Sequence, residues 1–204
     1  MIYYLLKCVN SFISYISSPG AGKNTFSSNY YKTLYKVKND YFESSDDELT
    51  FTKGIWMISE EERRKIPKHI FKDILDVEGF QIDDIKSWQY VMIISFLSTD
   101  LIILNRNEKF DDVKKIINII GNGLKKMQEM NMPRILKTIY IQNNKNHPKP
   151  IAELLKTFNY DENIFQKIKF KYIYLPYINS KTDEKKDLMD YYEYKNAFYE
   201  ILNY

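Results

Sequence analysis

The sequence predicts an α/β fold, in which a mostly parallel central sheet carries helices on both faces. Apolar blocks of strand length alternate along the chain with longer segments of helical periodicity, and this alternation favours parallel strands joined by crossover helices. At 204 residues, of which 44% are hydrophobic and 28% charged, the chain can bury a substantial core. Since no block repeats another at a fixed period, we predict a single domain over residues 1–204, in which 1–10 and 180–204 are flanking segments.

Six short apolar blocks are the predicted strands. Their length and apolar content are typical of buried strands. Four of them end just before a polar or glycine-containing loop. In a parallel sheet such loops gather at the carboxyl ends of the strands, where ligands bind. The predicted strands are 11–16, 55–58, 71–76, 100–105, 137–141 and 170–175.

Helical periodicity is clearest over residues 111–130. Six apolar side chains there fall on one face of a helix, and Asp111 and Asp112 suit its N-terminus, where carboxylates complement the helix dipole. Two further amphipathic helices are predicted at 149–158 and near 183–202. The apolar residues on the shared face of the first helix are Val113, Ile116, Ile117, Ile120, Leu124 and Met127.

Charge and composition exclude several classes of protein. Thirty basic residues against 27 acidic ones leave a formal net charge of +3, which is too even for a nucleic-acid-binding stripe or a polybasic membrane anchor. The apolar run 91–104 contains Asp100 and is shorter than the roughly 20 residues that span a bilayer, so it is predicted to be a core segment. The single Cys8 cannot form an internal disulfide, and His69 and His147 make a poor metal set. A reducing compartment is therefore expected.

The loop after the first predicted strand is a partial match to the phosphate-binding pattern GxxxxGK(S/T). It has Gly22 and Lys23 in place, but Ser17 stands for the first glycine and Asn24 for the hydroxyl residue. Small residues let backbone N–H groups surround a phosphate at the N-terminus of a helix, and a lysine ammonium neutralises the phosphate oxygens. An ordinary Ser/Pro/Gly turn is the alternative for such a degenerate motif. The small residues of the loop are Pro19, Gly20, Ala21 and Gly22.

Two later segments follow this loop in the order that a G domain requires. FTKGIWM comes after an acidic stretch, and ILDVEG closes a predicted strand. At the end of a buried strand Asp76 would lie close to a nucleotide-bound magnesium ion, the N–H of Gly79 would meet the γ-phosphate, and Thr52 would complete the metal shell. Taken singly, Asp76 could equally be a turn residue and Trp56 a core anchor. Taken together, the three motifs predict a nucleotide site.

TKGIWM followed by DVEG resembles the G domain of the dynamin-superfamily large GTPases. Within that group the chain is similar to the root-hair-defective (Sey-type) proteins, which fuse endoplasmic reticulum membranes, and to the guanylate-binding proteins. The resemblance continues through 95–105, the strand after the second switch, through 137–141, the base-recognition strand, and through 170–176, the last strand of the Sey-type domain; it covers 11–179. It implies a three-layer P-loop GTPase-like domain that binds and hydrolyses GTP with Mg²⁺ and pairs head to head as a G-domain homodimer.

The resemblance also implies roles for individual residues. Lys23, Thr52 and Asp76 would be catalytic, with Lys23 on the β- and γ-phosphates. Asn24, Thr52 and Asp76 would hold the metal ion, and Gly79 would sense the γ-phosphate. The other nucleotide-binding positions would be Ser18, Pro19, Gly20, Ala21, Gly22, Thr25, Gln142 and Asn143.

Three departures from the family pattern support an alternative, a catalytically inactive pseudo-GTPase that serves as a nucleotide-binding or protein-interaction module. Ser17 would cost about 1 kcal/mol if the backbone there needed a positive φ. Asn24 replaces the serine that ligates magnesium, which weakens the metal site. Asn143 stands where the family has an aspartate and presents a donor to the guanine edge in place of an acceptor, a mismatch of roughly 1–3 kcal/mol. The arginine finger of guanylate-binding proteins falls on Gly20, a gap that Sey-type loops share.

Partners and location also follow from the resemblance. We expect GTP, GDP and a second G domain as partners, no nucleic acid, and no transmembrane span in the chain itself. The chain would be cut off from, or naturally lack, the helical bundle and membrane hairpin of full Sey-type proteins. A membrane link would then come only through a missing region or a partner, and the expected location is cytoplasmic, at the cytosolic face of the endoplasmic reticulum.

Overall fold

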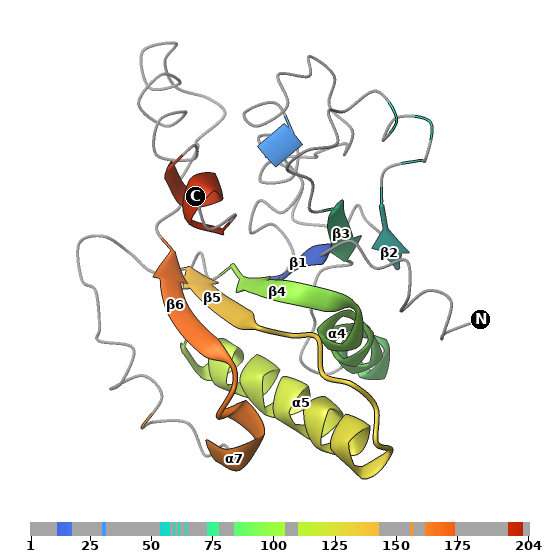
Figure 1. Ribbon diagram of the computed structural model, residues 1–204, viewed down its shortest axis with the longest axis vertical. Helices are drawn as coiled ribbons and strands as arrows, with labels where there is room; N and C mark the ends of the chain where they lie inside the picture. Colours follow the sequence, from blue (N-terminus) through green and yellow to red (C-terminus); the bar gives the residue numbers. More distant parts are fainter. Residues whose placement is uncertain are drawn as a thin grey trace.

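The computed structural model has a central sheet in the strand order β2-β3-β1-β4-β5-β6 (Figure 1). Neighbouring strands are parallel, except for β2 and β3, which are antiparallel. The strands are β1 (Phe12–Ile16), β2 (Ile55–Trp56), β3 (Asp73–Val77), β4 (Ser98–Ile103), β5 (Thr138–Gln142) and β6 (Lys169–Ile173). The structure describes residues 12–17, 30–31, 54–57, 59, 61, 64, 73–77, 84–104, 110–142, 156, 162–173 and 196–201.

Helices cover both faces of the sheet. On one face lie α4 (Ile85–Leu97), α5 (Phe110–Glu129) and the short α7 (Glu162–Phe165), and on the other lie the helical residues 196–201, drawn in red in Figure 1. We call these the α4–α5 face and the C-terminal face. The architecture confirms the predicted α/β fold class, with a mostly parallel central sheet between helical layers.

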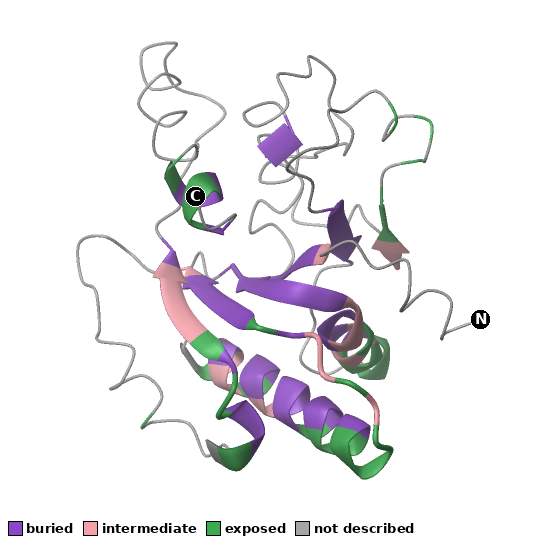
Figure 2. Cartoon of the chain, in the orientation of Figure 1, coloured by how far each residue is buried: buried purple, intermediate pink, exposed green. Residues whose placement is uncertain are grey.

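The main hydrophobic core lies between the sheet and α5. Alternate residues of β4 and β5, among them Leu101, Ile103 and Ile139, point into it and are at most 1% exposed. Figure 2 shows α5 buried along the side that faces the sheet and exposed along the other. Asp111 and Asp112 occupy its first turn as predicted. All six apolar residues predicted for the buried side of α5 are buried, so the amphipathic pattern is confirmed.

Two glycines of α5 let neighbouring helices approach closely. A Cβ at Gly121 would lie 3.1 Å from the ring of Phe165 in α7, and one at Gly123 would lie 3.3 Å from the ring of Phe96 in α4. Both distances are shorter than ordinary carbon–carbon contact. The absence of side chains at these two positions therefore sets how tightly α4 and α7 pack on α5.

The helix α4 was not predicted, and the expectation that 95–105 forms one strand is wrong in its first three residues. The chain stays helical to Leu97, and β4 begins directly at Ser98, whose extended backbone (φ −103°, ψ 142°) ends the helix. Apolar residues occur on both sides of α4, with Ile85 75% exposed and Ile94 fully buried. Such a distribution gives no clear helical period. The prediction that 91–104 is a core segment is confirmed, since it contributes buried residues from α4 and β4 to one core.

The first and last residues of the other predicted strands differ from the observed ones by at most two residues, wherever the structure describes that end. Of the predicted helix 149–158, only Lys156 is described, and it is helical. Of the predicted helix near 183–202, residues 196–201 are described and helical. The rest of both segments lies outside the described residues.

Candidate functional site

The candidate site is the edge of the sheet where the parallel strands end. The chain order reverses at β1, because β2 and β3 lie on one side of it and β4, β5 and β6 on the other. Ligands of open α/β sheets bind at the carboxyl ends of the strands beside such a reversal. The strands that end at this edge bring together Ser17 after β1, Asp76 in β3 and Gln142 in β5. Asp76 and Gln142 were predicted from the sequence as site residues, and Ser17 as the first position of the phosphate loop.

Asp76 is the best-defined residue of this edge. It is the next-to-last residue of β3 and is only 1% exposed. The register Ile13↔Ile74 between β1 and β3, continued by two residues, places the buried Tyr15 beside Asp76 on the C-terminal face. Asp76 thus lies one residue before the strand end, next to the strand that leads into the predicted phosphate loop.

The antiparallel pairing of β2 with β3 brings the two later motifs together. Ile55 pairs with Val77, and Trp56 pairs with Asp76. Because β2 runs against β3, the residues that precede β2 lie toward the carboxyl end of β3. Gly54, directly before β2, therefore lies toward the edge that carries Asp76, and Thr52 lies outside the described residues.

The backbone conformation of Gly54 explains why the TKGIW segment has a glycine at this position. Its φ is +86°, and a Cβ there would meet nothing within 4 Å. The requirement is therefore conformational rather than steric, since side-chain-bearing residues rarely adopt this backbone geometry. Ile55 packs against the main core. Trp56 is 59% exposed, so the alternative that it is a core anchor is wrong.

Ser17 does not carry the strain that its position suggested. Among the described non-glycine residues, the one with a positive φ is Asn131, at 53°. Ser17 follows β1 directly and is 1% exposed. The backbone N–H of Leu104 donates to the carbonyl of Ile16 at 2.8 Å, which continues the β1–β4 ladder to this point. A side chain at the first-glycine position is therefore accommodated without a left-handed backbone.

On the predicted base side, β5 ends at Gln142. This residue is partly buried and pairs in register with Ile173 of β6. Two residues earlier, Tyr140 lies on the same face and is fully buried. Burial, with smaller contributions from the charges of Asp100 and Glu200, raises the pKa of Tyr140 above its ordinary value. Its hydroxyl group therefore stays protonated and acts as a donor at physiological pH.

A magnesium ion fits this edge in its donor chemistry. Mg²⁺ prefers oxygen ligands and is usually held by one or two carboxylates together with substrate phosphates. The buried carboxylate of Asp76 is of that kind. Within the described part of the chain, no three His, Cys, Asp or Glu side chains gather as a metal cluster. Asn24 and Thr52, the other predicted ligands, lie outside the described residues.

Most of the predicted phosphate and base contacts stay predictions. The structure describes Asp76 and Gln142 from the predicted set and brings both to the same sheet edge. The predicted site residues outside the described part of the chain are Ser18, Pro19, Gly20, Ala21, Gly22, Lys23, Asn24, Thr25, Thr52, Gly79 and Asn143.

Aromatic residues on the C-terminal face were missed by the sequence reasoning. Tyr30 and Tyr31 are fully buried, and so is Phe198. The ring of Tyr30 meets those of Tyr31 and Phe198 edge to face, with centroids 5.4 and 5.3 Å apart. The high tyrosine content, 18 residues, was the available signal, but it does not indicate which rings meet across the fold.

Neither a protein-family model nor a curated protein sequence matches the chain. Among solved structures, it is similar to a chain of the signal recognition particle receptor SRb-GTP/SRX complex from Chaetomium thermophilum, with 12% identity, a TM-score of 0.44, and coverage of 91% of this chain and 98% of that one. It is also similar to GDP-bound IFT22 from T. brucei, with 16% identity, a TM-score of 0.34, and coverage of 95% and 96%. At these values no residue correspondence follows, so the site rests on the chain's own strands and motifs.

In the part of the chain that the structure describes, no helix has both the length and the hydropathy needed to cross a bilayer.

Proposed function

We propose that this chain binds GTP together with Mg²⁺ and hydrolyses it to GDP and phosphate. The observation that carries the proposal is the position of Asp76, a buried carboxylate one residue before the end of β3, beside the strand that leads into the GK-containing loop. The antiparallel β2 brings the TKGIW segment to the same edge. The described residues of the three motifs, Ser17, 54–56 and Asp76, lie at the edge where an α/β sheet binds ligands, which supports the proposal.

Each residue has a stated part in this proposal. Lys23 would neutralise the β- and γ-phosphate oxygens, and the small residues around it would let backbone N–H groups face the phosphates. Asp76 and Thr52 would orient the oxygen shell of the magnesium ion, with Asn24 as a substitute ligand. The metal ion, when bound, supplies charge neutralisation as the phosphoryl group is transferred. Gln142 ends the strand that leads to Asn143, the residue proposed to face the base.

The direct test of this function is binding of a fluorescent GTP analogue with and without magnesium. We expect binding by the wild-type protein, weaker binding without magnesium, and a loss of about tenfold or more in Lys23→Ala, since charge-assisted hydrogen bonds contribute about 1.5–3 kcal/mol. Equal binding by wild-type protein and Lys23→Ala would overturn the proposal. Folding of the variant is checked by its thermal transition, which should match that of the wild-type protein.

A pseudo-GTPase is the second candidate, and the residue pair Asn24 and Asn143 favours it. Both replace side chains that the resemblance assigns to the metal ion and to the guanine base. The third departure carries less weight, since Ser17 has no positive φ. Phosphate release separates the candidates: turnover that Lys23→Ala abolishes supports the enzyme, whereas tight binding without turnover supports the pseudoenzyme. Calorimetry with GTP, GDP, ATP and XTP in magnesium would report which base the site prefers with Asn143 in place of the family's aspartate.

The finer assignment, a single Sey-type G domain over residues 1–204, is part of the proposal and is supported by the TKGIW segment and its pairing with β3. Head-to-head pairing of two G domains and a location at the cytosolic face of the endoplasmic reticulum are proposed on the same resemblance. Light scattering with GTP and with a transition-state mimic tests the pairing. A mass that stays monomeric under both conditions would remove the homodimer from the proposal.

A further inference from the structure

The helical residues 196–201 lie on the C-terminal face of the sheet and are linked to both sides of the candidate site. Three of them, Ala197, Phe198 and Ile201, are at most 5% exposed, so the segment is docked through an apolar side. We call residues 196–201 the C-terminal segment. Its contacts reach β5 in one direction and, through Tyr30 and Tyr31, β3 in the other.

The contact with β5 is made by Tyr140. Its hydroxyl group donates to the backbone carbonyl of Glu200 at 3.4 Å, and the ammonium group of Lys171 lies 5.8 Å from the centre of its ring. Tyr140 lies two residues before Gln142 in the same strand. A shift of the C-terminal segment therefore acts on the strand that leads to the proposed base-binding residues.

The contact with β3 runs through two tyrosines. Phe198 meets the ring of Tyr30 edge to face, and Tyr30 meets Tyr31 in the same way. The hydroxyl group of Tyr31 accepts a hydrogen bond of 3.3 Å from the backbone N–H of Ile74, two residues before Asp76 in β3. Tyr30 and Tyr31 belong to the part of the chain that follows the phosphate loop. The docked segment thus contacts the proposed base strand through Tyr140 and the chain beyond the phosphate loop through Tyr30, and it is linked to the metal-side strand through Tyr31.

From this arrangement we infer that the C-terminal segment regulates the nucleotide site: its docking holds β5, β3 and residues 30–31 in the nucleotide-binding arrangement, and nucleotide binding in turn strengthens its docking. The inference rests on the proposed function, because it concerns the same site. The two sites are the sheet edge and the C-terminal face, and the two states are the segment docked and undocked. Coupling between sites is reciprocal, so each equilibrium must change the other by the same factor.

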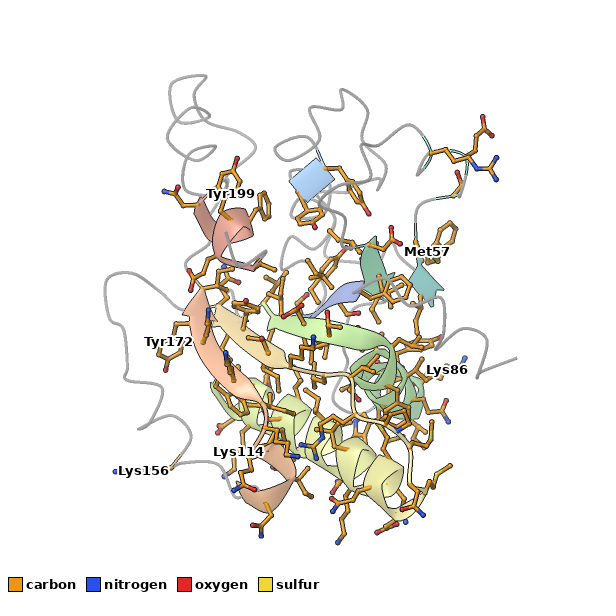
Figure 3. The ribbon with its side chains drawn as sticks, viewed as in Figure 1. Met57, Lys86, Lys114, Lys156, Tyr172 and Tyr199 are labelled. Carbon is orange, nitrogen blue, oxygen red and sulfur yellow. The ribbon has the colours of Figure 1, made fainter. Side chains whose placement is uncertain are left out.

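The coupling predicts how nucleotide affinity responds to Phe198. Phe198→Ala removes the ring that meets Tyr30 and favours the undocked state, so the affinity for a fluorescent GTP analogue should fall by about 5- to 150-fold, the usual range of such coupling. Tyr199→Ala is the matched control, since the neighbouring ring is 39% exposed and labelled in Figure 3; its affinity should equal that of the wild-type protein. Tyr140→Phe, which removes only the hydroxyl group, should fall between the two.

Hydrogen exchange of the amides in 197–201 supplies a readout that a merely structural role would not change. In the wild-type protein, saturating GTP and magnesium should slow this exchange by a factor that is at least as large as the affinity loss in Phe198→Ala. If Phe198→Ala does not fold, the series wild type, Tyr140→Phe and Phe198→Leu replaces it, and affinity should fall as exchange in 197–201 rises.

The outcomes separate this inference from the proposed function. If the wild-type protein does not bind GTP, the proposed function fails, and the coupling fails with it. A second outcome is that the wild-type protein binds GTP, while Phe198→Ala has freely exchanging amides in 197–201 and an unchanged affinity for GTP. That outcome overturns the coupling but leaves GTP binding in place. Exchange in 197–201 that is unaffected by nucleotide overturns it as well.

Discussion

The two faces of the sheet are built from different side chains. The α4–α5 face is mainly aliphatic, with Leu101, Ile103 and Ile139 packed against α4 and α5. The C-terminal face combines buried acids with aromatic rings, including Asp76 and Tyr140. Aliphatic packing is non-directional and stabilises the fold through buried area, whereas buried polar groups depend on particular partners. The first face accounts for stability, and the second carries the groups to which we assign function.

The largest effect is expected in the aliphatic core. Ile117→Ala replaces a fully buried side chain of α5, and such truncations cost about 2–5 kcal/mol of unfolding free energy. Urea denaturation should show this loss. Below the unfolding transition, however, the affinity for GTP should stay near that of the wild-type protein, because Ile117 contacts the opposite face from Asp76. A core variant that lost nucleotide binding while still folded would contradict the division between the faces.

A smaller effect is expected at the entry to β2. Gly54→Ala places a side chain on a residue with φ +86°, which costs about 1–2 kcal/mol where the backbone keeps that conformation. Because Gly54 lies between Thr52 and the strand pair, the variant should also weaken magnesium-dependent binding. Gly123→Ala serves as the control for binding: its Cβ would crowd Phe96 in α4 and act on stability, but its affinity for GTP should equal that of the wild-type protein, since Gly123 lies in α5 on the other face of the sheet. Unchanged stability of Gly54→Ala would show that TKGIW does not need its glycine for this turn.

The smallest effect concerns the N-terminus of α4 and depends on pH. The carboxylate of Asp84 accepts hydrogen bonds of 3.1 Å from the backbone N–H groups of Lys86 and Ser87. These bonds, first that from Lys86, hold the pKa of Asp84 below its ordinary value. A lowered pKa in the folded state stabilises the fold above the unfolded pKa of about 3.9 and ceases to do so as pH falls through the folded value.

Thermal unfolding at neutral and at acidic pH checks this expectation. The melting temperature of the wild-type protein should fall on acidification by more than that of Asp84→Asn. Asparagine also caps helices but has no charge to lose. Parallel curves for the two proteins would exclude a contribution of the Asp84 charge.

From the sequence we could predict those helices and strands whose apolar residues follow a regular pattern within the segment itself. The apolar stripe of α5 and the six strand positions follow from patterns within each segment, and they were confirmed. The helix α4 was missed because its apolar residues, such as Ile85 and Ile94, lie on opposite sides. At the site, Asp76 could be predicted from its motif. The aromatic contacts of Tyr30 and Phe198 could not, because those residues are distant in the sequence and meet only through the packing of the C-terminal face.

The most direct test of the central claim compares the two buried carboxylates of β3. Asp73 and Asp76 lie in one strand, are at most 1% exposed and point to opposite faces of the sheet, so each is a control for the other. We measure magnesium-dependent GTP binding by Asp76→Asn and Asp73→Asn. The account predicts that Asp76→Asn loses about 10- to 100-fold in affinity in magnesium, while Asp73→Asn binds as the wild-type protein does. Equal affinities for both variants, or a loss confined to Asp73→Asn, would contradict it.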